Sequence, residues 1–314
     1  MNKLYCIGEA LIDFIPAGEA PDGTQLLAPM PGGATANTAV AAAKLGVDAA
    51  FVGKVGDDGF GRMLIDVIKG YGVDTAYMSK TRKACTTLSF VTLSSDGDRS
   101  FTFARKPGAD MMLSADDIPD GLFREGDILH FGTLGLMPGS LSKEAHNKAI
   151  LNAKENGAFI SFDPNIRLAL WDDHMVLKVI ILDYLPYADI IKVSDDELEF
   201  IFDTKDEQVA AAYCIDRGAS LLFVTRGKNG AAFYTKEHSF EIPGKDVTAV
   251  DTTGAGDAFN GAMLSRLLEK PLSESLEPET LTDTLRFANA AGAVTVTRKG
   301  AMAGSPTIEE INSF

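Results

Sequence analysis

Short apolar segments that suit β-strands alternate with longer segments that suit α-helices along most of this chain. The apolar stretch 4–8 is followed by an Ala-rich helical stretch at 34–45, a strand at 50–55 and a helix at 60–71. Strands that alternate with helices are typical of a sheet covered by helices on both faces. The order of the elements therefore predicts an α/β fold.

The alternation returns in the second half of the chain. We expect strands at 128–131, 158–163, 190–193 and 221–225, a strand end at 247–250, and helices at 142–156, 175–185, 195–202, 258–268 and 281–296. The Gly-rich segment 299–304 is expected to be a loop. Because no internal repeat, low-complexity tract or long linker is visible, residues 1–314 are expected to form a single domain.

One segment breaks the alternation. Residues 86–93 and 99–103 are rich in β-formers and flank a turn at 95–98, which predicts a β-hairpin. With residues 13–30, the segment 86–105 is expected to form a small β-sheet lid inserted in the main domain. The alternating faces of this hairpin also suggest a homodimer that pairs through the lid.

The composition excludes several classes of protein. Among 314 residues, 29 Lys and Arg face 44 Asp and Glu, and a net charge of −15 argues against nonspecific nucleic-acid binding and against anionic membrane surfaces. Cys6, Cys85 and Cys214 form no CxxC pair, which fits a reducing compartment without disulfides or a zinc site. Glu9 and Asp13 interrupt the N-terminal apolar stretch, so it does not resemble a signal peptide. With no apolar run of membrane-spanning length, these features predict a cytoplasmic protein.

The segment DTTGAGDAFNG at 251–261 points most directly to chemistry. A Gly-Ala-Gly turn that opens a helix directs free backbone N–H groups and the positive end of the helix dipole at one point, which favours an anion. Asp257 directly follows this turn and could take a proton from a hydroxyl group. The combination suggests phosphoryl transfer to an alcohol.

Other interpretations of this segment are open when it is taken alone. An ordinary helix start with an acidic first turn explains it as well. A dinucleotide fingerprint would need a third glycine where the chain has Phe259, and no GxxxxGK[ST] phosphate loop occurs anywhere in the sequence.

A second glycine loop lies near the N-terminus. Gly32 and Gly33 would let the backbone approach a polyhydroxyl ligand closely, and Asn37 offers both a donor and an acceptor to hydroxyl groups. Asp13 follows the first strand, at the end of the sheet where ligands of α/β proteins gather. A simple loop and a solvated acid are the plainer alternatives.

Three further loops follow later strands. DPNIR at 163–167 could clamp phosphate through Arg167, and SDDE at 194–197 could orient a water on Mg²⁺ through Glu197. TRGKNG at 225–230 could enclose a nucleotide phosphate. Ordinary surface loops and a hairpin turn would account for each of them separately.

The order of these motifs resembles the ribokinase-like family of sugar and purine kinases over nearly the full chain. The resemblance rests on the Gly-Gly…Asn segment at 32–37 with Gly46, and on the segment at 251–257. The segments at 105–110, 163–171 and 193–197 look most like those of bacterial fructokinases. The resemblance implies a three-layer α/β/α sandwich with a small β-sheet lid, ATP as phosphoryl donor, and Mg²⁺.

The resemblance also implies a role for each matching residue. The catalytic group comprises Gly254, Ala255, Gly256 and the base Asp257, and the N–H groups of the last three form the anion hole. The sugar would be bound by Asp13, Gly32, Gly33, Asn37, Arg105 and Asp257. ATP would be bound by Arg167, Lys192, Thr225, Gly227, Gly230, Gly254, Gly256 and Asn289. Glu197 would reach Mg²⁺ through water, and K⁺ would be held by Asp251, Thr253, Thr295, Arg298 and Gly300.

One residue departs from the family pattern, because Ser194 stands where many members have Asn, and this weakens a magnesium role for residue 194. The expected function is an ATP-dependent sugar kinase that converts D-fructose to fructose 6-phosphate. Kinases for ribose, 2-keto-3-deoxygluconate or a nucleoside are the alternatives within the family. A NAD-dependent oxidoreductase and a noncatalytic sugar-binding regulator are the alternatives from other classes.

Overall fold

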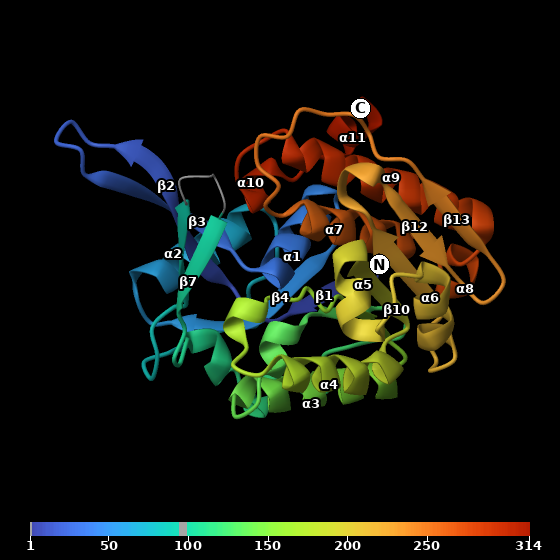
Figure 1. The fold of residues 1–314 in the computed structure, drawn as a ribbon. Coiled ribbons are helices and arrows are strands. Elements are labelled where there is room, and N and C mark those ends of the chain that lie inside the picture. Colours follow the sequence, from blue (N-terminus) through green and yellow to red (C-terminus); the bar gives the residue numbers. More distant parts are fainter. Residues whose placement is uncertain (1, 94–98) are drawn as a thin grey trace.

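A large mixed sheet forms the centre of the molecule (Figure 1). The computed structural model describes residues 2–93 and 99–314. Within these residues nine strands lie in the order β13-β12-β11-β10-β9-β8-β1-β4-β5. The strands span Leu4–Ile7 (β1), Ala49–Gly56 (β4), Met78–Thr81 (β5), Ile128–Phe131 (β8), Phe159–Phe162 (β9), Ile190–Ser194 (β10), Leu221–Thr225 (β11), Ala231–Tyr234 (β12) and Ser239–Ile242 (β13). All neighbours from β11 to β5 are parallel, and the antiparallel strands β12 and β13 complete one edge.

The order of the strands reverses at β1. From β1 the chain first adds β4 and β5 on one side, and later adds β8, β9, β10 and β11 on the other. In open α/β sheets such a reversal leaves a crevice at the carboxyl ends of the two central strands, where ligands bind. The crevice expected here lies beyond Ile7 in β1 and Phe131 in β8.

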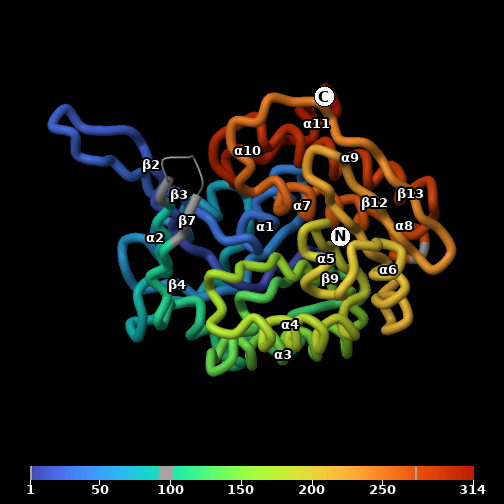
Figure 2. Tube along the Cα trace, in the orientation of Figure 1, coloured from blue at the N-terminus to red at the C-terminus, as the bar shows by residue number. Residues whose placement is uncertain are grey.

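Helices cover both faces of the sheet and make a three-layer sandwich, as the sequence predicted (Figure 2). One face carries helices α1 (Ala34–Lys44), α2 (Gly59–Gly70), α7 (Ala255–Leu267) and α9 (Pro278–Val296). The other carries α3 (Leu141–Glu155), α4 (His174–Tyr184), α5 (Asp195–Phe202) and α6 (Glu207–Ile215). Strand β1 shows why both faces are apolar: Leu4 and Cys6 belong to the first core, and Tyr5 and Ile7 belong to the second.

A second, smaller sheet lies beside the main one. Its four described strands are ordered β3-β2-β6-β7 and span Gln25–Gly32, Leu11–Glu19, Leu88–Leu93 and Arg99–Ala104, respectively. The hairpin of β2 and β3 projects away from the rest of the molecule (Figure 1). These strands overlap the predicted lid segments, although β2 begins at Leu11 and β3 ends at Gly32, and the predicted turn at 95–98 lies outside the described residues. That this sheet acts as a lid stays a prediction.

Two local predictions were wrong, and one helix was missed. Residues 247–250 form no strand; they cross the end of α9, where the Val250 N–H donates to the Val296 carbonyl. The expected loop at 299–304 contains a short helix, α10 (Ala301–Gly304), and its first turn closes through a bond from the Gly304 N–H to the Gly300 carbonyl. Helix α6 was not predicted, although its N-cap Asp206 accepts bonds from two backbone N–H groups.

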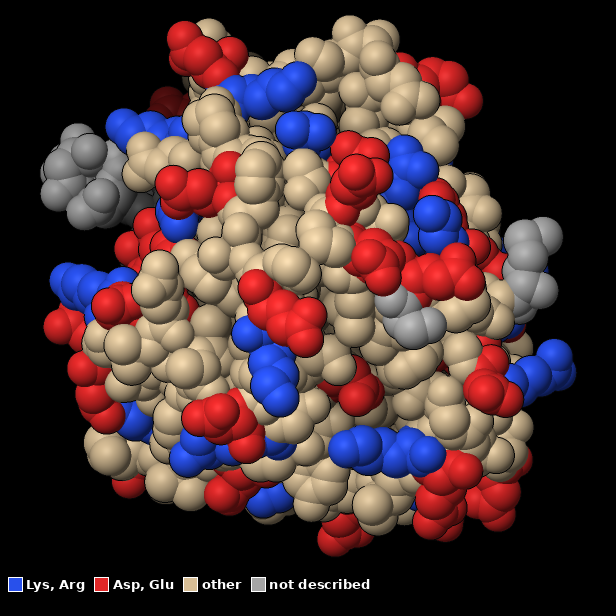
Figure 3. Space-filling view, turned by 90° about the vertical axis from the view of Figure 1, so that its right-hand side faces the viewer, with Lys and Arg blue, Asp and Glu red and all other residues tan. Residues whose placement is uncertain are grey.

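The remaining helices, α8 (Leu272–Ser275) and α11 (Ile308–Asn312), are short and pack near α9. On the face shown in Figure 3, the drawn Lys and Arg side chains are interspersed with Asp and Glu rather than gathered in one area. None of the described helices combines the length and the apolar character that crossing a membrane requires.

Candidate active site

The GAGD segment forms the start of helix α7, next to the expected crevice. Gly254 is the N-cap residue, and its left-handed backbone (φ 80°) is unfavourable for other residues. A Cβ at this position would also lie 2.4 Å from the Cβ of Ala301. Glycine is therefore needed here for two reasons, and the first-turn N–H groups after it have no partner within the helix. The start of α7 thus has the properties of an anion site.

Asp257 lies in the first turn of α7 and faces helix α1. One of its carboxylate oxygens accepts a hydrogen bond of 2.8 Å from the side-chain amide of Asn37. Burial raises the pKa of Asp257 to about 6, although the Asn37 bond and the charge of Arg167 oppose the shift. A carboxylate with this pKa is ionised at neutral pH and is a stronger base than an ordinary aspartate.

Lys192 brings a buried positive charge to the same place. Its side chain rises from β10, and its Nζ lies 3.3 Å from the carboxylate of Asp163. A Cβ on Gly256 would lie 3.4 Å from this Nζ, so the ammonium group is close to the first turn of α7. Burial lowers the pKa of Lys192, but the charges of Asp163, Glu197 and Asp257 outweigh that effect and raise it overall. Lys192 is therefore a permanent cation beside the candidate anion site.

Asp163 connects Lys192 with helix α7. The Asp163 oxygen that faces Lys192 also accepts a 2.7 Å hydrogen bond from the side-chain amide of Asn260. Asp163 follows β9, whereas Asn260 lies one turn after Asp257 in α7. Because all three side chains are almost fully buried, the contact holds the start of α7 against β9 and β10.

The predicted sugar residues lie at the other side of the crevice. Gly32 and Asp13 are in contact, since a Cβ on Gly32 would lie 2.4 Å from a carboxylate oxygen of Asp13. Gly33 has a positive φ of 109°, and a Cβ there would lie 2.3 Å from the Glu9 carbonyl oxygen. Burial raises the pKa of Asp13, and the charge of Arg167 opposes this, as it does for Asp257. Arg167 thus acts electrostatically on both carboxylates.

Asn37 has capacity left for a ligand. Its amide nitrogen is used by Asp257, but its side-chain oxygen is buried and has no hydrogen-bond partner among the described residues. An unpaired buried acceptor is costly, and a ligand hydroxyl group would satisfy it.

A groove on the other side of the α7 start unites most of the predicted nucleotide residues. It runs between the loop after β11, the segment 244–252, and helices α7 and α9. Its lining includes Thr225, Gly227, Gly230, Gly256 and Asn289, together with the apolar side chains of Val247, Ala249, Phe259 and Val296. Apolar walls with few polar groups suit a purine base, and the groove ends at the candidate anion site.

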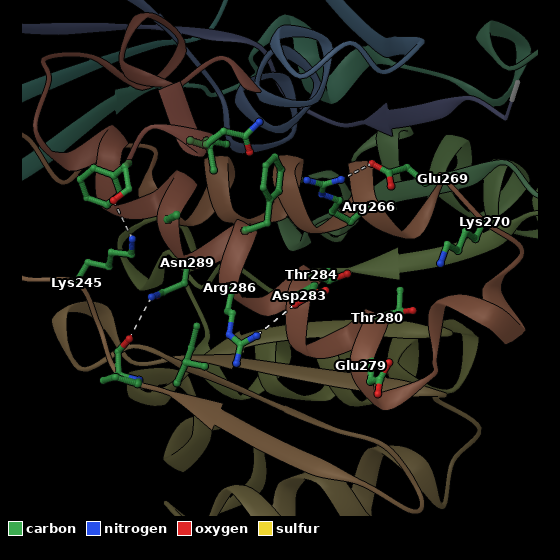
Figure 4. A pocket seen from close by; sticks show the side chains of 17 residues that line it. Lys245, Arg266, Glu269, Lys270, Glu279, Thr280, Asp283, Thr284, Arg286 and Asn289 are labelled. Atoms are coloured by element: carbon green, nitrogen blue, oxygen red, sulfur yellow. Dashed lines mark hydrogen bonds and ion pairs between the residues drawn. The ribbon is translucent and has the colours of Figure 1, made fainter. Parts of the chain in front are cut away.

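Asn289 lies in the wall between this groove and a second surface pocket over α9 (Figure 4). Its amide donates a 3.3 Å hydrogen bond to the Pro243 carbonyl. The second pocket contains several cationic side chains, but Arg266 pairs with Glu269 at 2.9 Å and Arg286 with Asp283 at 3.3 Å. Apart from Asn289 it holds none of the predicted site residues.

Glu197 has a structural task that the sequence analysis did not recognise. Ser194 is the N-cap of α5, and one Glu197 oxygen accepts a bond of 2.8 Å from its backbone N–H. The other oxygen accepts a bond of 2.6 Å from the Ile166 N–H. The Ser-x-x-Glu spacing before a helix is the sequence signature of this capping box. The proposed magnesium role of Glu197 remains a prediction.

The predicted K⁺ site consists of Asp251 and the backbone of four further residues. Asp251 accepts hydrogen bonds of 3.0 Å from the backbone N–H groups of Thr253 and Gly300, which brings those three together. The Arg298 side chain turns to Glu310 at 2.8 Å, which leaves the predicted role to the Arg298 backbone. That K⁺ binds there stays a prediction. No group of three or more His, Cys, Asp or Glu within the described ranges has the geometry of a metal site.

Arg105 has structural contacts that the sequence analysis did not predict. Its guanidinium group is buried, lies 2.6 Å from Asp110, and donates to the Leu134 carbonyl at 2.9 Å. These contacts anchor the end of β7 to the main domain. A sugar contact by Arg105 stays a prediction.

Sequence reasoning missed Asp163 and Asn260 as members of the site, and it treated Glu9 only as an interruption of an apolar stretch. For Asn260 a signal was present, because residues three apart lie on one helical face and Asn260 follows Asp257 at that spacing. For Asp163 the neighbouring Arg167 drew the functional interpretation instead. Glu9 becomes recognisable only when the strand order places it at the crevice.

Comparison with known proteins agrees with this geometry. The family described as "pfkB family carbohydrate kinase" matches residues 1–308 of this chain. A probable fructokinase-2 of Arabidopsis thaliana is 44% identical over 311 residues, which are 98% of this chain and 94% of that protein. A fructokinase of Vibrio cholerae, solved with fructose, ADP and a calcium ion, is 35% identical with a TM-score of 0.90, and the match covers 100% of this chain and 99% of that one.

A double mutant of the same Vibrio enzyme was solved with fructose, ADP and a potassium ion, and it matches with the same identity of 35% and TM-score of 0.90, over 100% and 98% of the two chains. An aminoimidazole riboside kinase of Salmonella enterica, solved with aminoimidazole riboside and an ATP analogue, is 33% identical with a TM-score of 0.87, covering 99% of both chains. Given the match over nearly the whole length and the ribokinase-like fold, this chain belongs to the pfkB family of carbohydrate kinases.

Proposed function

We propose that this protein is an ATP-dependent fructokinase that transfers the γ-phosphoryl group of ATP to D-fructose and forms fructose 6-phosphate. The observation that carries the proposal is the position of Asp257. It lies between Asn37, which has a free acceptor, and the start of α7, beside Lys192. The identity to fructokinases across nearly the full length supports fructose as the acceptor.

The first chemical task is to prepare the sugar. Asp13 and the free oxygen of Asn37 would accept hydrogen bonds from sugar hydroxyl groups, and the Gly32-Gly33 backbone would allow close approach. The reacting hydroxyl would then face Asp257, which takes its proton as the oxygen attacks phosphorus. General base catalysis of this kind is worth about 10²–10⁴-fold.

The second task is to stabilise charge on the transferred group. The first-turn N–H groups of α7 and the Lys192 ammonium would face the phosphoryl oxygens, and Arg167 would add charge from the loop after β9. Preorganised donors of this kind act without reorganisation and contribute strongly to phosphoryl transfer.

The chain's residues fit Mg²⁺ carried by the nucleotide better than a protein cage. Glu197 is the acid predicted to reach Mg²⁺ through water, and both of its oxygens already accept hydrogen bonds from backbone N–H groups. Mg²⁺ keeps several waters and binds through phosphates in such sites, where it neutralises their charge. We further propose K⁺ near Asp251, Thr253 and Gly300, where it would support the anion site electrostatically.

A homodimer through the small sheet and a cytoplasmic location complete the proposal. Leu26 and Leu27 on the projecting strand β3 are each 44% exposed, which supports a partner on that strand.

The decisive experiment is a sugar panel. The purified protein is incubated with MgATP and D-fructose, D-ribose, 2-keto-3-deoxygluconate, D-glucose or aminoimidazole riboside, and ADP release is followed with a coupled assay. We expect the highest kcat/KM with fructose. Higher kcat/KM with ribose or the riboside would replace fructose as the substrate, and no release with any of them would refute the kinase proposal. The same assay in Na⁺ or K⁺ buffers tests the cation.

A nucleoside kinase is the second candidate, since the Salmonella riboside kinase shares the fold at 33% identity. The residues at the phosphate side would be the same in either case. Only the surroundings of Asp13 distinguish the two acceptors, which is why the panel includes a riboside.

A further inference from the structure

A small chamber lies where the strand order reverses, next to the predicted base Asp257. It is bounded by the residues after β1 and β8, the first turns of α1, and helix α7. Its volume of about 10 Å³ is the room for a single water molecule. The lining residues used below are Glu9, Thr38, His130, Asp163, Asp257 and Asn260.

Two of these residues carry polar atoms that are unsatisfied. The Thr38 hydroxyl and the Asn260 side-chain oxygen are buried and have no hydrogen-bond partner among the described residues. Thr38 is 0% exposed and Asn260 is 1% exposed. Leaving such a group unpaired costs about 1–3 kcal/mol, so two of them at one chamber indicate a bound polar molecule.

Two acids at this chamber have pKa values near neutrality. Burial raises the pKa of Glu9 to about 7, against the opposing hydrogen bond from the Ala34 N–H. Burial also raises the pKa of Asp257 to about 6. Glu9 and Asp257 can therefore exchange a proton at little cost.

Two further ionisable residues, Asp163 and His130, line the chamber. Asp163 is paired with Lys192 and Asn260, and burial lowers the pKa of His130 to about 4, so that its ring is neutral. Around Glu9, the charge of Asp110 raises its pKa and that of Arg105 lowers it. The charges of Arg167 and Lys192 lower the pKa of Asp257, and that of Asp163 raises it.

We propose that the chamber holds one ordered water molecule, bound by Thr38 and Asn260, that connects Asp257 with Glu9 and carries the proton taken from the sugar hydroxyl on to Glu9. In this step the O–H bond of protonated Asp257 breaks and its proton binds the water oxygen. One of the water's own O–H bonds breaks at the same time, and that proton binds the Glu9 carboxylate. Two O–H bonds break and two form, so the net result is the transfer of one proton from Asp257 to Glu9 without any change of oxidation state. Glu9 thus acts through Asp257, and the inference rests on the proposed role of Asp257 as base.

The relay would remove the proton from Asp257 while the crevice is filled. When sugar and nucleotide fill the crevice, Asp257 loses contact with bulk water and holds the proton it has taken. Proton transfer through the chamber water to Glu9 returns Asp257 to its basic form before the products leave.

The substitution Glu9→Gln tests this directly. Glutamine has the same shape and keeps an oxygen for the Ala34 N–H, but it cannot accept the proton. We expect the wild-type kcat to show two ionisations, near the pKa values of about 7 and about 6 of the two acids. Glu9→Gln should leave one ionisation and lower the plateau kcat about 5- to 10-fold, at the lower end of general acid–base effects. Two ionisations and an unchanged plateau in the variant would overturn the relay.

Thr38→Val and Thr38→Ser form a matched pair for the water. Valine keeps the shape and removes the hydroxyl, whereas serine keeps the hydroxyl. A high-resolution crystal structure should show the water in the wild type and in Thr38→Ser, and it should be missing or displaced in Thr38→Val. A wild-type chamber without water would contradict the proposal.

A third measurement does not need any kinase activity. Carboxyl ¹³C NMR titration gives the pKa of Glu9 in the wild type and in Asp257→Asn. Coupled acids influence each other, so we expect the pKa of Glu9 to fall by about 0.5–1 unit in the variant. If the protein phosphorylates no sugar, this titration and the water still decide the inference, while the sugar panel alone decides the function. An unchanged Glu9 pKa would show that the two acids are not connected.

Discussion

The two sides of the candidate active site differ in how firmly the protein holds them. The phosphate side, meaning Asp257, Lys192, Asp163 and Asn260, is built on β9, β10 and α7 and is held by buried hydrogen bonds. On the sugar side, Asp13 and Gly32 lie in the small sheet, whose hairpin projects from the body and is largely exposed, and Gly33 follows β3 as the N-cap of α1. The residues proposed for phosphoryl transfer thus lie in the core, and the residues proposed to select the sugar lie at its edge.

This difference has a simple physical consequence. Charges in the core cannot move without leaving a buried group unpaired, which fixes the geometry of phosphoryl transfer. Residues on a projecting sheet can change without disturbing that core. A family with such a division can keep one reaction and vary its acceptors, and the predictions below test both sides of it.

The largest effect is expected from Asp257→Asn. Loss of the proposed base should lower kcat about 10²–10⁴-fold while ATP still binds. Because the change removes a buried charge, Tm at neutral pH should not fall. Steady-state kinetics, nucleotide titration and thermal unfolding measure the three quantities, and the exposed Asp216→Asn in the loop after α6 is the control. A near-normal kcat would reduce Asp257 to a helix-start residue.

Lys192→Met should have the next largest effect, about 10²–10³-fold on kcat, as for other lost charge-stabilising donors. It also leaves Asp163 buried without its cation, which should cost about 3–5 kcal/mol in the free energy of unfolding. Adding Asp163→Asn should recover most of this stability but not the activity. If the double variant recovered activity as well, Lys192 would act only as a structural partner. Lys236→Met, exposed in the turn after β12, is the control.

On the sugar side, Asp13→Asn should act mainly on KM. A hydrogen bond to a charged group is worth about 1.5–3 kcal/mol, so the KM for the sugar should rise about 10- to 100-fold, with kcat and the KM for ATP within a few-fold. Asp22→Asn, at the exposed tip of the same hairpin, should change none of these constants. An equal loss of kcat would place Asp13 with the phosphate side.

The pH dependence follows from the raised pKa of Asp257. The base works in its deprotonated form, so activity requires a pH above about 6, the pKa that burial gives it. The logarithm of kcat should be nearly flat at higher pH and should fall as the pH drops below about 6; in Glu9→Gln, where the ionisation of Asp257 alone is left, it should fall by one for each unit below that value. Full activity at about pH 5 would contradict the assignment of the base.

The smallest effect is expected from the outer margin. Replacing Leu26 and Leu27 by Ser removes two exposed apolar side chains of β3. If the proposed dimer forms there, sedimentation velocity should show it dissociate, while kcat stays within about two-fold because neither leucine is among the predicted site residues. Replacing the exposed Leu151 on α3 by Ser is the control. A dimer that persists would place the interface elsewhere.

The prediction from sequence succeeded where local pattern and function coincide. Strand–helix alternation indicated the three layers, and the GAGD segment indicated a helix start with a carboxylate, both confirmed by the structure. It failed where structure depends on distant partners. Residues 247–250 have the composition of a strand but find no neighbouring strand, and the capping contacts of Glu197 with the backbone of Ser194 and Ile166 were not foreseen, while its predicted magnesium role stays a prediction.

Residue order was enough to predict most of the helices, the two glycine turns before α1 and α7, and the family of the chain, because these depend on local backbone conformation and on motif order. Which polar groups meet depends on the three-dimensional fold. Asn37 and Asp257 are 220 positions apart, and Asp163 and Asn260 are 97 apart. Their contacts arise because parallel strands bring distant loops to one edge of the sheet, and the burial produced there raises the pKa values of Glu9 and Asp257.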